Sequence, residues 1–580
     1  MSASTISHLV LLTNNLTSNP YVHFGQSSLW PRGYPLERIG LAPDRTYDLC
    51  ETRTPAIQQG VVNGDPDLDA IGRLTRKHPS SKLVLKFDQA APPYLLPSGT
   101  FAPFNSQNTF FRQSAFWAMF LPTMVPDRVS DIFRSYWAQR LMWLIGENLA
   151  FAPPNAFQER NGHSDLEDAK DEAGLYHGVG NYIKELTRWK CSKQTFFDCV
   201  SELSHDLVVA GLWKSRDAEI VDAWIADLSA LGYQPPEMIP ETSGPCLSNE
   251  PLNVVFYPVE QNTTLPHDTR LHHLPQSTNH EVMAETLSLW CGPAFAHHWK
   301  LALVNAHKYS DSLLIISVYH NFETIVPVLE AFYKPNYPQI LYCTNRRVSG
   351  GFMKQWKLSV LQLKETPGAI PCILSAFDMN YNVKGYLHIT DLMWMKTDHQ
   401  IAKKHTSLMW LTGEFDAYKP RTLKLCDENT IHCQPMSKDV LLNLVSDLDD
   451  MTSLPDKKKI KIRACVAKME RDPTWVAQKE LVWVTDLALY LPDRLVPDLK
   501  RMREVFNTEN QKPFEFMAPL LLECDQLTTE YLEHSEELES ISPERKGDYV
   551  FPFPFHNVSS GSVSDKAIRK SYCAHFEQYS

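Results

Sequence analysis

The chain of 580 residues lacks the signatures of several common functional classes. It has no stretch of the ~18–20 consecutive apolar residues that a membrane-spanning helix needs. It also has no Gly-x-Ser-x-Gly, His-Glu-x-x-His, P-loop or Gly-x-Gly-x-x-Gly motif, so serine-hydrolase, zinc-protease and dinucleotide chemistry have no support. The twelve cysteines form no Cys-x-x-Cys pair, and we therefore expect no structural zinc site.

Clustered positive charge and targeting signals are scarce as well. The formal net charge is −12, and the longest basic run is residues 457–463, so duplex nucleic acid is not an expected partner. Residues 1–15 have no basic segment and too short an apolar run for a signal peptide. Three glycosylation sequons, at Asn15, Asn262 and Asn557, give weak support for a lumenal location.

What the chain does have is the ordinary composition of a globular protein, with 43% hydrophobic and 21% charged residues. Residues 1–233 carry dense apolar and aromatic patterning. Residues 234–279 are rich in Pro, Ser, Thr and Asn, which is typical of a linker between domains. A second globular part is expected at residues 280–560, followed by a loose tail at residues 561–580.

The second part alternates strand and helix patterns, which predicts a parallel sheet covered on both faces. The predicted strands include residues 313–320 and 339–345, with a helix at 322–333 between them. Asp391 directly follows another apolar segment, residues 385–390. Ligands of parallel sheets bind at the carboxyl ends of strands, so Asp391 is a candidate site residue.

Residues 19–40, NPYVHFGQSSLWPRGYPLERIG, combine Gly and Pro with Trp30, Tyr34, Arg32 and Arg38. Gly and Pro fix unusual backbone angles, while aromatic rings and guanidinium groups offer stacking faces and forked donors. This composition indicates an ordered loop shaped to hold a ligand. A rigid surface turn between two strands is the alternative interpretation.

A second candidate site lies in residues 63–70, NGDPDLDA, which are followed by Arg73. Asp67 and Asp69 are two residues apart, so on an extended segment both side chains face the same way. Paired carboxylates are able to hold a divalent cation, and a nearby arginine is able to meet a phosphate. The alternative is a solvated Asp-rich turn, because Asn-Gly and Asp-Pro are common turn signals.

A third candidate lies in residues 103–111, PFNSQNTFF, where Asn105, Gln107 and Asn108 stand among aromatic residues. Amides bordered by aromatic faces are a common way to hold sugar hydroxyl groups. The alternative, a turn that leads into the next helix, is compatible with that role.

The first part ends in helical patterns, of which residues 128–147 are the clearest. Asp127 or Ser130 is expected to cap this helix. Asp131 lies in its first turns, where an anion is stabilised by the helix dipole, and this favours a local structural role. The alternative is that Asp131 projects into a cleft as a general base.

Taken together, these stretches resemble the STELLO family of Golgi glycosyltransferases. The resemblance is dense over residues 19–236, where the family's segments occur in the family's order with similar spacing. It is thinner in the second part, at residues 385–395 and 486–502.

The resemblance implies an α/β protein with two transferase-like domains and mostly parallel sheets, the first of them GT-A-like and incomplete. It also implies a location in the Golgi lumen, a nucleotide-sugar donor such as a UDP-sugar, Mn²⁺ or Mg²⁺ as cofactor, and a glycan or protein acceptor. Asp131 would then be the catalytic candidate, and Asp391 the site residue of the second domain. The implied donor- and substrate-binding residues are Arg32, Asp67, Asp69, Arg73, Asn105, Gln107 and Asn108.

The sequence also departs from the family pattern. Family members carry a membrane anchor and an acidic metal-binding motif upstream of the segment that begins here at Asn19, and this chain starts eighteen residues before it. Leu392 replaces a second acidic residue after Asp391, and residues 153–160 lack the family's His and Asp. We therefore expect impaired or absent transferase activity in the chain as written.

Two alternatives to an active enzyme follow from these departures. The first is a non-catalytic partner in a Golgi assembly that makes glycans. The second is a shortened product whose first half does not fold properly, because a parallel sheet without its central strands leaves edges and apolar faces uncovered.

Overall fold

The computed structural model describes residues 5–75, 83–239, 244–247, 250–261, 309–365 and 367–391, with short pieces between residues 285 and 296 and after residue 392. It divides the chain into two compact units. The first comprises Met1–Ser277 with Lys357–Gln362 and Asp378–Asn382, and the second comprises Thr278–Trp356, Leu363–Phe377 and Val383–Ser580.

The first unit is built on a mixed β-sheet. Its strand order is β10-β7-β2-β1-β4-β6-β3-β5. The strands are β1 (Thr5–Leu11), β2 (Thr46–Arg53), β3 (Ile57–Gly64), β4 (Tyr94–Leu95), β5 (Thr109–Phe111), β6 (Leu149–Gln158), β7 (Leu252–Val255) and β10 (Ser359–Gln362). Parallel pairs such as β1–β4 and β3–β6 stand beside antiparallel pairs such as β1–β2, β4–β6 and β3–β5.

The α/β class predicted from the sequence is confirmed, whereas the sheet of this unit is mixed instead of mostly parallel. Long irregular segments, not regular crossover helices, connect β1 to β2 and β4 to β5. Such segments leave the direction of the next strand open, and apolar periodicity does not reveal it.

Strand β7 lies inside the segment predicted as a linker. Leu252–Val255 pairs antiparallel with both β2 and β10, so this stretch belongs to the sheet. Four residues are too few to show a periodic pattern, and the pairing that makes them a strand comes from partners distant in sequence.

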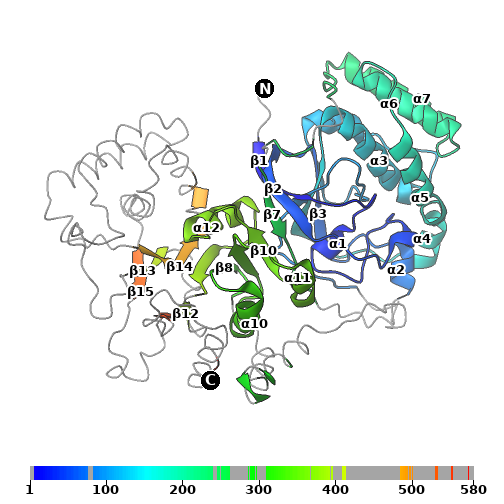
Figure 1. The fold of residues 1–580 in the computed structure, drawn as a ribbon. Coiled ribbons are helices and arrows are strands. Elements are labelled where there is room, and N and C mark those ends of the chain that lie inside the picture. Colours follow the sequence, from blue (N-terminus) through cyan, green and yellow to red (C-terminus); the bar gives the residue numbers. More distant parts are fainter. Residues whose placement is uncertain are drawn as a thin grey trace, which may run out of the picture. The chain divides into compact units, whose positions relative to one another are not determined.

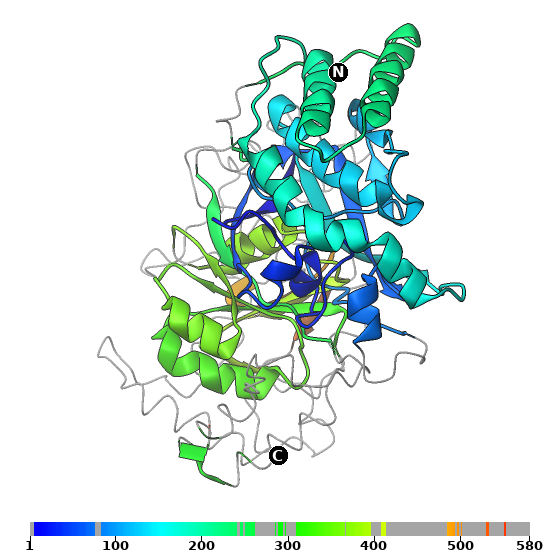
Figure 2. The same cartoon turned by 90° about the vertical axis from the view of Figure 1, so that its right-hand side faces the viewer.

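Helices gather on one side of the strands of the first unit in Figure 1, and Figure 2 turns this helical side toward the viewer. They are α3 (Asp127–Met142), α4 (Asp165–Asp171), α5 (Ala173–Arg188), α6 (Phe196–Val209) and α7 (Ser215–Ala230). Shorter elements are α1 (Pro20–His23), α2 (Ala70–Leu74) and the 3₁₀ helices η1 (Leu36–Arg38), η2 (Gln113–Met119) and η3 (Trp143–Ile145).

Helix α3 is the core helix of this unit. Most of its side chains are buried, including Trp137 and Tyr136, which are completely inaccessible to solvent. The predicted cap is wrong, because the helix starts after Pro126 and no side chain caps it. Pro126 has no side-chain group that accepts a hydrogen bond, and the Ser130 hydroxyl donates to the Asp127 carbonyl oxygen at 2.9 Å instead of capping the helix.

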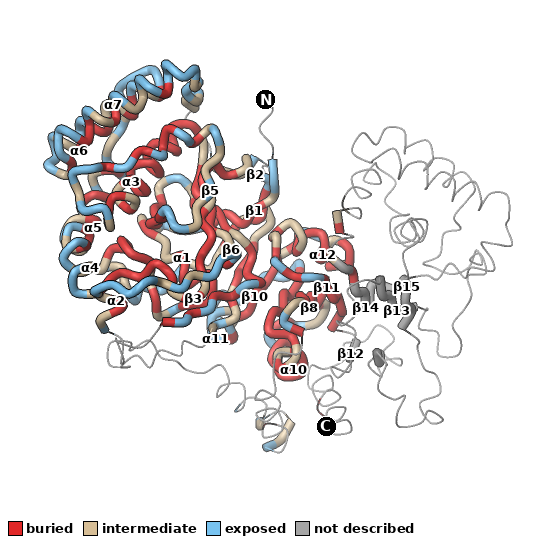
Figure 3. The backbone as a smooth tube through the Cα atoms, turned by 180° about the vertical axis from the view of Figure 1, so that it is seen from behind, coloured by how far each residue is buried: buried red, intermediate tan, exposed pale blue. Residues whose placement is uncertain are grey.

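The second unit contains the predicted parallel strands. Strands β8 (Ser312–Ser317), β9 (Ile340–Thr344) and β11 (Gly385–Thr390) run parallel, with β8 between the other two. Every residue of these strands is buried, as Figure 3 shows for β8 and β11. The helices are α10 (Phe322–Tyr333), α11 (Gly350–Trp356) and α12 (Ala369–Asp378). Strands fully buried on both faces match the sequence prediction for this sheet.

Of the remaining strands of the second unit, some extend this sheet and others form a separate sheet. Strand β14 (Val484–Pro492) pairs antiparallel with β11, β13 (Leu408–Thr412) pairs antiparallel with β14, and β15 (Thr529–Leu532) pairs parallel with β13. The pair β12 (Met393–Met395) and β16 (Val550–Pro552) forms a separate two-stranded sheet.

All cysteines in the described residues are paired in disulfides. The pairs are Cys50–Cys246 and Cys191–Cys199 in the first unit, and Cys291–Cys573 and Cys343–Cys372 in the second. In the same part of the chain, no helix is both long enough and apolar enough to cross a membrane. The basic run 457–463, Leu392 and the sequons at Asn262 and Asn557 lie outside the described residues.

Candidate functional site

The loop of residues 19–40 is ordered by its own side chains. Asn19 caps the short helix α1, because its side-chain oxygen accepts from the Tyr21 amide at 3.1 Å while its amide group donates to the Leu29 carbonyl at 2.7 Å. Gly33 has φ +81°, and a Cβ there would lie 2.3 Å from the Ile132 side chain on α3. Only glycine permits so close an approach, so Gly33 brings the loop against α3.

Arg32, held by this approach, joins two carboxylates from different parts of the chain. Its Nε and Nη2 donate to the two oxygens of Asp67, at 2.9 and 2.8 Å. Its Nη1 and Nη2 donate to the two oxygens of Asp131, at 3.1 and 3.3 Å. A guanidinium group is suited to this role, since its planar fork is able to satisfy carboxylates in pairs.

Burial and charge act in opposite directions on this group of residues. Burial alone would lower the pKa of Arg32, but the charges of Asp67 and Asp131 outweigh it and raise the pKa above its ordinary value. Burial would raise the pKa of Asp67, but the charge and hydrogen bonds of Arg32 outweigh it and lower the pKa. The pair is therefore fully ionised at neutral pH.

The predicted amide segment, residues 103–111, contacts both carboxylates that Arg32 holds. The Asn105 side chain donates to Asp67 at 2.7 Å, and the backbone amide of Ser106 donates to Asp131 at 3.0 Å. Gln107 is exposed next to it, and its backbone amide donates to the Asn105 side-chain oxygen at 2.9 Å. Asn108 is turned away, because its amide group donates to Asn155 at 2.7 Å and to the Gly60 carbonyl at 3.2 Å.

Asp69 and Arg73 have structural partners. Asp69 caps α2 by accepting from the Gly72 amide at 2.6 Å, and it accepts from the Trp30 indole at 2.5 Å. Burial raises the pKa of Asp69 to about 6, although both hydrogen bonds lower it. Arg73 pairs with Asp65 at 2.7 Å and donates to the Pro66 carbonyl at 2.8 Å. These contacts shape the turn, and a role of either residue in donor binding stays a prediction.

The structure thus joins three of the separately predicted segments, and α3, around one cation. We call Arg32, Asp67, Asn105 and Asp131 the Arg32 cluster. Within it, the Asp131 side chain is 14% exposed and the Asp67 side chain 11%. Chemically, the cluster presents a carboxylate that a guanidinium group holds in place, next to the exposed residues Ser106 and Gln107.

Asp391 lies in the second unit. It follows β11 directly, at the carboxyl end predicted from the sequence, and its side chain is fully buried. It accepts from the backbone amides of Tyr319 and His320 at 3.0 and 2.9 Å, and it contacts the His320 ring at 3.0 Å. These contacts hold the loop that enters α10, while a substrate-binding role for Asp391 is a prediction.

An ion-pair network beside the Arg32 cluster was not predicted from the sequence. Arg128 pairs with Glu172 at 2.6 Å and with Asp168 at 3.1 Å. Glu172 is completely buried and accepts from the Ala70 amide at 2.8 Å and the Tyr176 hydroxyl at 2.6 Å. No local pattern marks Glu172, since Ala70 lies 102 residues earlier in the chain.

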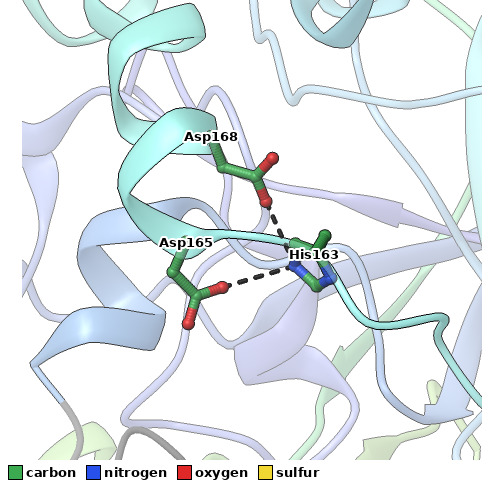
Figure 4. A group of neighbouring side chains, drawn as sticks. All are labelled: His163, Asp165 and Asp168. Atoms are coloured by element: carbon green, nitrogen blue, oxygen red, sulfur yellow. Dashed lines mark ion pairs between the residues drawn. The ribbon is translucent and has the colours of Figure 1, made fainter.

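His163, Asp165 and Asp168 form the one group of described residues with the spacing of metal ligands. Figure 4 shows the His163 ring facing both carboxylates. Its Nε2 lies 3.3 Å from Asp165 and 3.1 Å from Asp168. Two guanidinium groups already compensate the Asp168 carboxylate, because Arg128 lies 3.1 Å and Arg160 3.6 Å from it. Mg²⁺ prefers an all-oxygen shell, and two adjacent cations repel any divalent ion.

The carboxylates of the turn at residues 65–69 do not fit a divalent cation either. Asp65 pairs with Arg73, Asp67 pairs with Arg32, and Asp69 caps a helix. We therefore derive no catalytic step through a metal ion at these residues.

Comparison with known proteins finds a family model and two relatives that are similar to part of this chain. The family model of the STELLO glycosyltransferases matches residues 128–250, which include α3 and its helical neighbours. This part of the chain is therefore similar to the STELLO glycosyltransferases.

Two relatives from Arabidopsis thaliana show the extent of the match. "Probable glycosyltransferase STELLO1" is 39% identical over 227 residues, and "Probable glycosyltransferase STELLO2" is 38% identical over 227 residues. In both cases the matched part is 39% of this chain and 29% of the relative. The chain therefore spans less than a third of the length of the relatives that it matches.

Proposed function

We propose that this protein is a glycosyltransferase that transfers a sugar from a nucleotide-sugar donor, such as a UDP-sugar, to a hydroxyl group of a glycan or protein acceptor, with activity impaired by its departures from the family pattern at Leu392 and residues 153–160. The observation that carries the proposal is the Arg32 cluster, in which the segments singled out by the sequence meet around Arg32, and Arg32 holds one partly exposed carboxylate, Asp131. The similarity of part of the chain to the STELLO glycosyltransferases supports the same class of reaction.

Asp131 is the residue that we assign to the acceptor. In the reaction the bond between the anomeric carbon and the donor phosphate breaks, the acceptor oxygen forms the new bond, and the nucleoside diphosphate leaves. The acceptor hydroxyl proton moves toward Asp131 and then to solvent. Because two hydrogen bonds from Arg32 fix the Asp131 carboxylate, the main contribution of Asp131 is to accept a hydrogen bond from the acceptor hydroxyl and to orient it.

Arg32 is a positioning residue in this proposal. It holds Asp131 through two hydrogen bonds and is itself anchored on Asp67, which Asn105 also holds. The neighbouring exposed segment at Ser106 and Gln107 offers polar groups to the acceptor.

The proposed location is the Golgi lumen. The four disulfides of the described residues support an oxidising compartment, because such bonds are rare in the reducing cytosol. Family resemblance leads us to expect Mn²⁺ or Mg²⁺ with the donor, and we assign that ion to none of the acidic groups described above.

The test uses the full chain, purified from a secretory expression host, with a panel of UDP-sugars and glycan acceptors. Transfer or slow donor hydrolysis is measured with and without added Mn²⁺. Asp131→Asn keeps the shape of the side chain but removes its charge, and we expect a loss of activity of about 10²-fold or more. Asp127→Asn is the matched control, since Asp127 is exposed on the first turn of the same helix and touches no member of the cluster.

The outcomes separate the two candidate functions. If Asp131→Asn transfers sugar as well as the parent, Asp131 has no part in the reaction. A folded parent chain that binds no donor favours the alternative, a non-catalytic Golgi assembly partner. The full engagement of Asp67 and Asp69 with internal partners is the observation behind that alternative. It predicts a stable complex recovered from Golgi membranes, and a chain found alone would contradict it.

A further inference from the structure

The loop of residues 19–40 also covers a cavity that the Arg32 cluster does not use. The cavity has a volume of ≈ 100 Å³. Trp30, Tyr34 and Arg38 of the loop singled out by the sequence line it, whereas no member of the Arg32 cluster does. Its polar and aromatic lining includes Ser27, Ser28, Trp30, Tyr34, Arg38 and Arg45.

The charged residues of this cavity leave an excess of positive charge. Two of them are arginines, Arg38 and Arg45, and one is an acid, Asp44. The Asp44 carboxylate is already held by neutral partners, the Asn15 amide at 2.8 Å and the Thr13 hydroxyl. His23 adds no charge, because burial lowers its pKa to about 3.

Both arginines have N–H groups that form no hydrogen bond with the described residues. The Arg45 guanidinium lies 5.3 Å from the centre of the Tyr257 ring, and its Nη1 donates to the Val22 carbonyl at 3.3 Å. Its Nε is buried and has no hydrogen-bond partner among the described residues. Arg38 makes no ion pair or side-chain hydrogen bond within the part of the chain that the structure describes. Burial raises the pKa of the nearby Tyr34, and the charge of Arg38 acts to lower this pKa. Buried donors without partners cost free energy unless a ligand or water satisfies them.

We propose that this cavity binds a phosphate- or sulfate-type oxyanion, with Arg38 and Arg45 as its charged donors. Guanidinium groups and hydroxyls are the usual partners of such anions, and the hydroxyls of Ser27 and Ser28 line the same space. The chain as a whole carries a formal charge of −12, so a locally positive cavity is not a reflection of general composition.

The walls and the rim of the cavity favour an oxyanion that is attached to a ring. Trp30 and Tyr34 line it, and the Trp30 ring is fixed because its N–H donates to Asp69 at 2.5 Å. Residues 40–43 at the rim are exposed, with Leu41 53% exposed. The volume suits one small group, so the rest of the ligand extends past this rim.

Two sources supply this chemistry, and both fit the lining. One is the phosphate of a nucleotide, and the other is a phosphate or sulfate carried by a glycan. The oxyanion site does not rest on the transfer reaction, because binding is measurable without any turnover.

Isothermal titration calorimetry on the full chain, at constant ionic strength in chloride, tests the site. The titrants are inorganic phosphate, sulfate, uridine diphosphate, glucose 6-phosphate and N-acetylglucosamine 6-sulfate. We expect the parent to bind oxyanions, and Arg38→Gln and Arg45→Gln each to weaken binding about tenfold or more, since each removes a charged hydrogen-bond donor. Arg188→Gln, which removes the same charge from a side chain that is 74% exposed on α5, should bind like the parent.

The titrations distinguish a nucleotide ligand, a glycan ligand and the absence of an oxyanion site. If uridine diphosphate binds most tightly and loses affinity in both variants, the source is a nucleotide. If a sugar phosphate or sulfate does so, the source is a glycan. Absence of binding by every titrant at millimolar concentration, or equal binding by Arg38→Gln and the parent, overturns the proposal. Arg38 lies on the short, partly exposed helix η1, so this variant remains decisive even where Arg45→Gln fails to fold.

Discussion

At the scale of single residues, the first unit depends on charged side chains that are taken out of water. Asp69 is 1% exposed, yet it holds both the Trp30 indole and the start of α2. These two hydrogen bonds stabilise its anion, but burial outweighs them and raises its pKa to about 6 from the usual 3.8. The neighbouring charges of Glu172 and Asp67 act in the same direction as burial.

This raised pKa predicts a specific dependence of stability on pH. The folded protein binds the Asp69 proton more tightly than the unfolded chain does, so stability contributed by this residue is lost as pH rises from about 4 to about 6. Relative to Asp69→Asn, the parent should lose about 1–3 kcal/mol of unfolding free energy across this window. Urea unfolding of both proteins at a series of pH values measures it.

The comparison has an internal control. Asp127→Asn alters an exposed carboxylate in the same unit and should follow the parent at every pH. A parent curve that runs parallel to that of Asp69→Asn throughout would show that Asp69 titrates alike in both states.

At the scale of elements, disulfides connect strands and helices to segments that have little regular structure. Cys50 on β2 is bonded to Cys246, which lies in the stretch before β7, and it packs against Val10 and Leu95 in the core. Cys191 and Cys199 close the short turn that enters α6. The two bridges belong to the same unit but span 196 and 8 residues of chain.

This difference in span predicts different contributions to stability. A longer loop loses more conformational entropy in the unfolded chain when it is closed, so Cys50→Ala/Cys246→Ala should destabilise the protein by ~3 kcal/mol more than Cys191→Ala/Cys199→Ala. Thermal unfolding of the two double variants against the parent measures the effect. Equal losses in both would mean that strain or residual structure in the unfolded chain outweighs loop entropy.

At the scale of the whole molecule, the disulfides predict the state of the protein in its compartment. Peptide mapping without reductant, on protein from a secretory host, should recover Cys50–Cys246, Cys191–Cys199, Cys343–Cys372 and Cys291–Cys573 as linked peptides. Protein made in a reducing cytosol should show free thiols at these positions and a lower unfolding temperature. Free Cys50 and Cys246 in the secreted protein would contradict the predicted oxidised state.

The sequence by itself was sufficient for features that depend on local pattern. The helix over residues 128–147 was predictable because aromatic and aliphatic residues recur at helical spacing, and α3 with η3 covers residues 127–145. The buried strands β8, β9 and β11 were predictable because strands covered on both faces are continuous apolar runs. The special loop at residues 19–40 was visible in its Gly, Pro and aromatic content.

Tertiary structure alone decided which residues meet. Arg32, Asp67 and Asp131 were each predicted separately, but their shared ion-pair cluster arises from the approach of Gly33 to Ile132, which no local pattern encodes. The mixed sheet, strand β7 and the buried Glu172 were likewise determined by partners distant in the chain. Periodicity records which face of a segment is buried, whereas strand direction and charge pairing depend on what the fold places against that face.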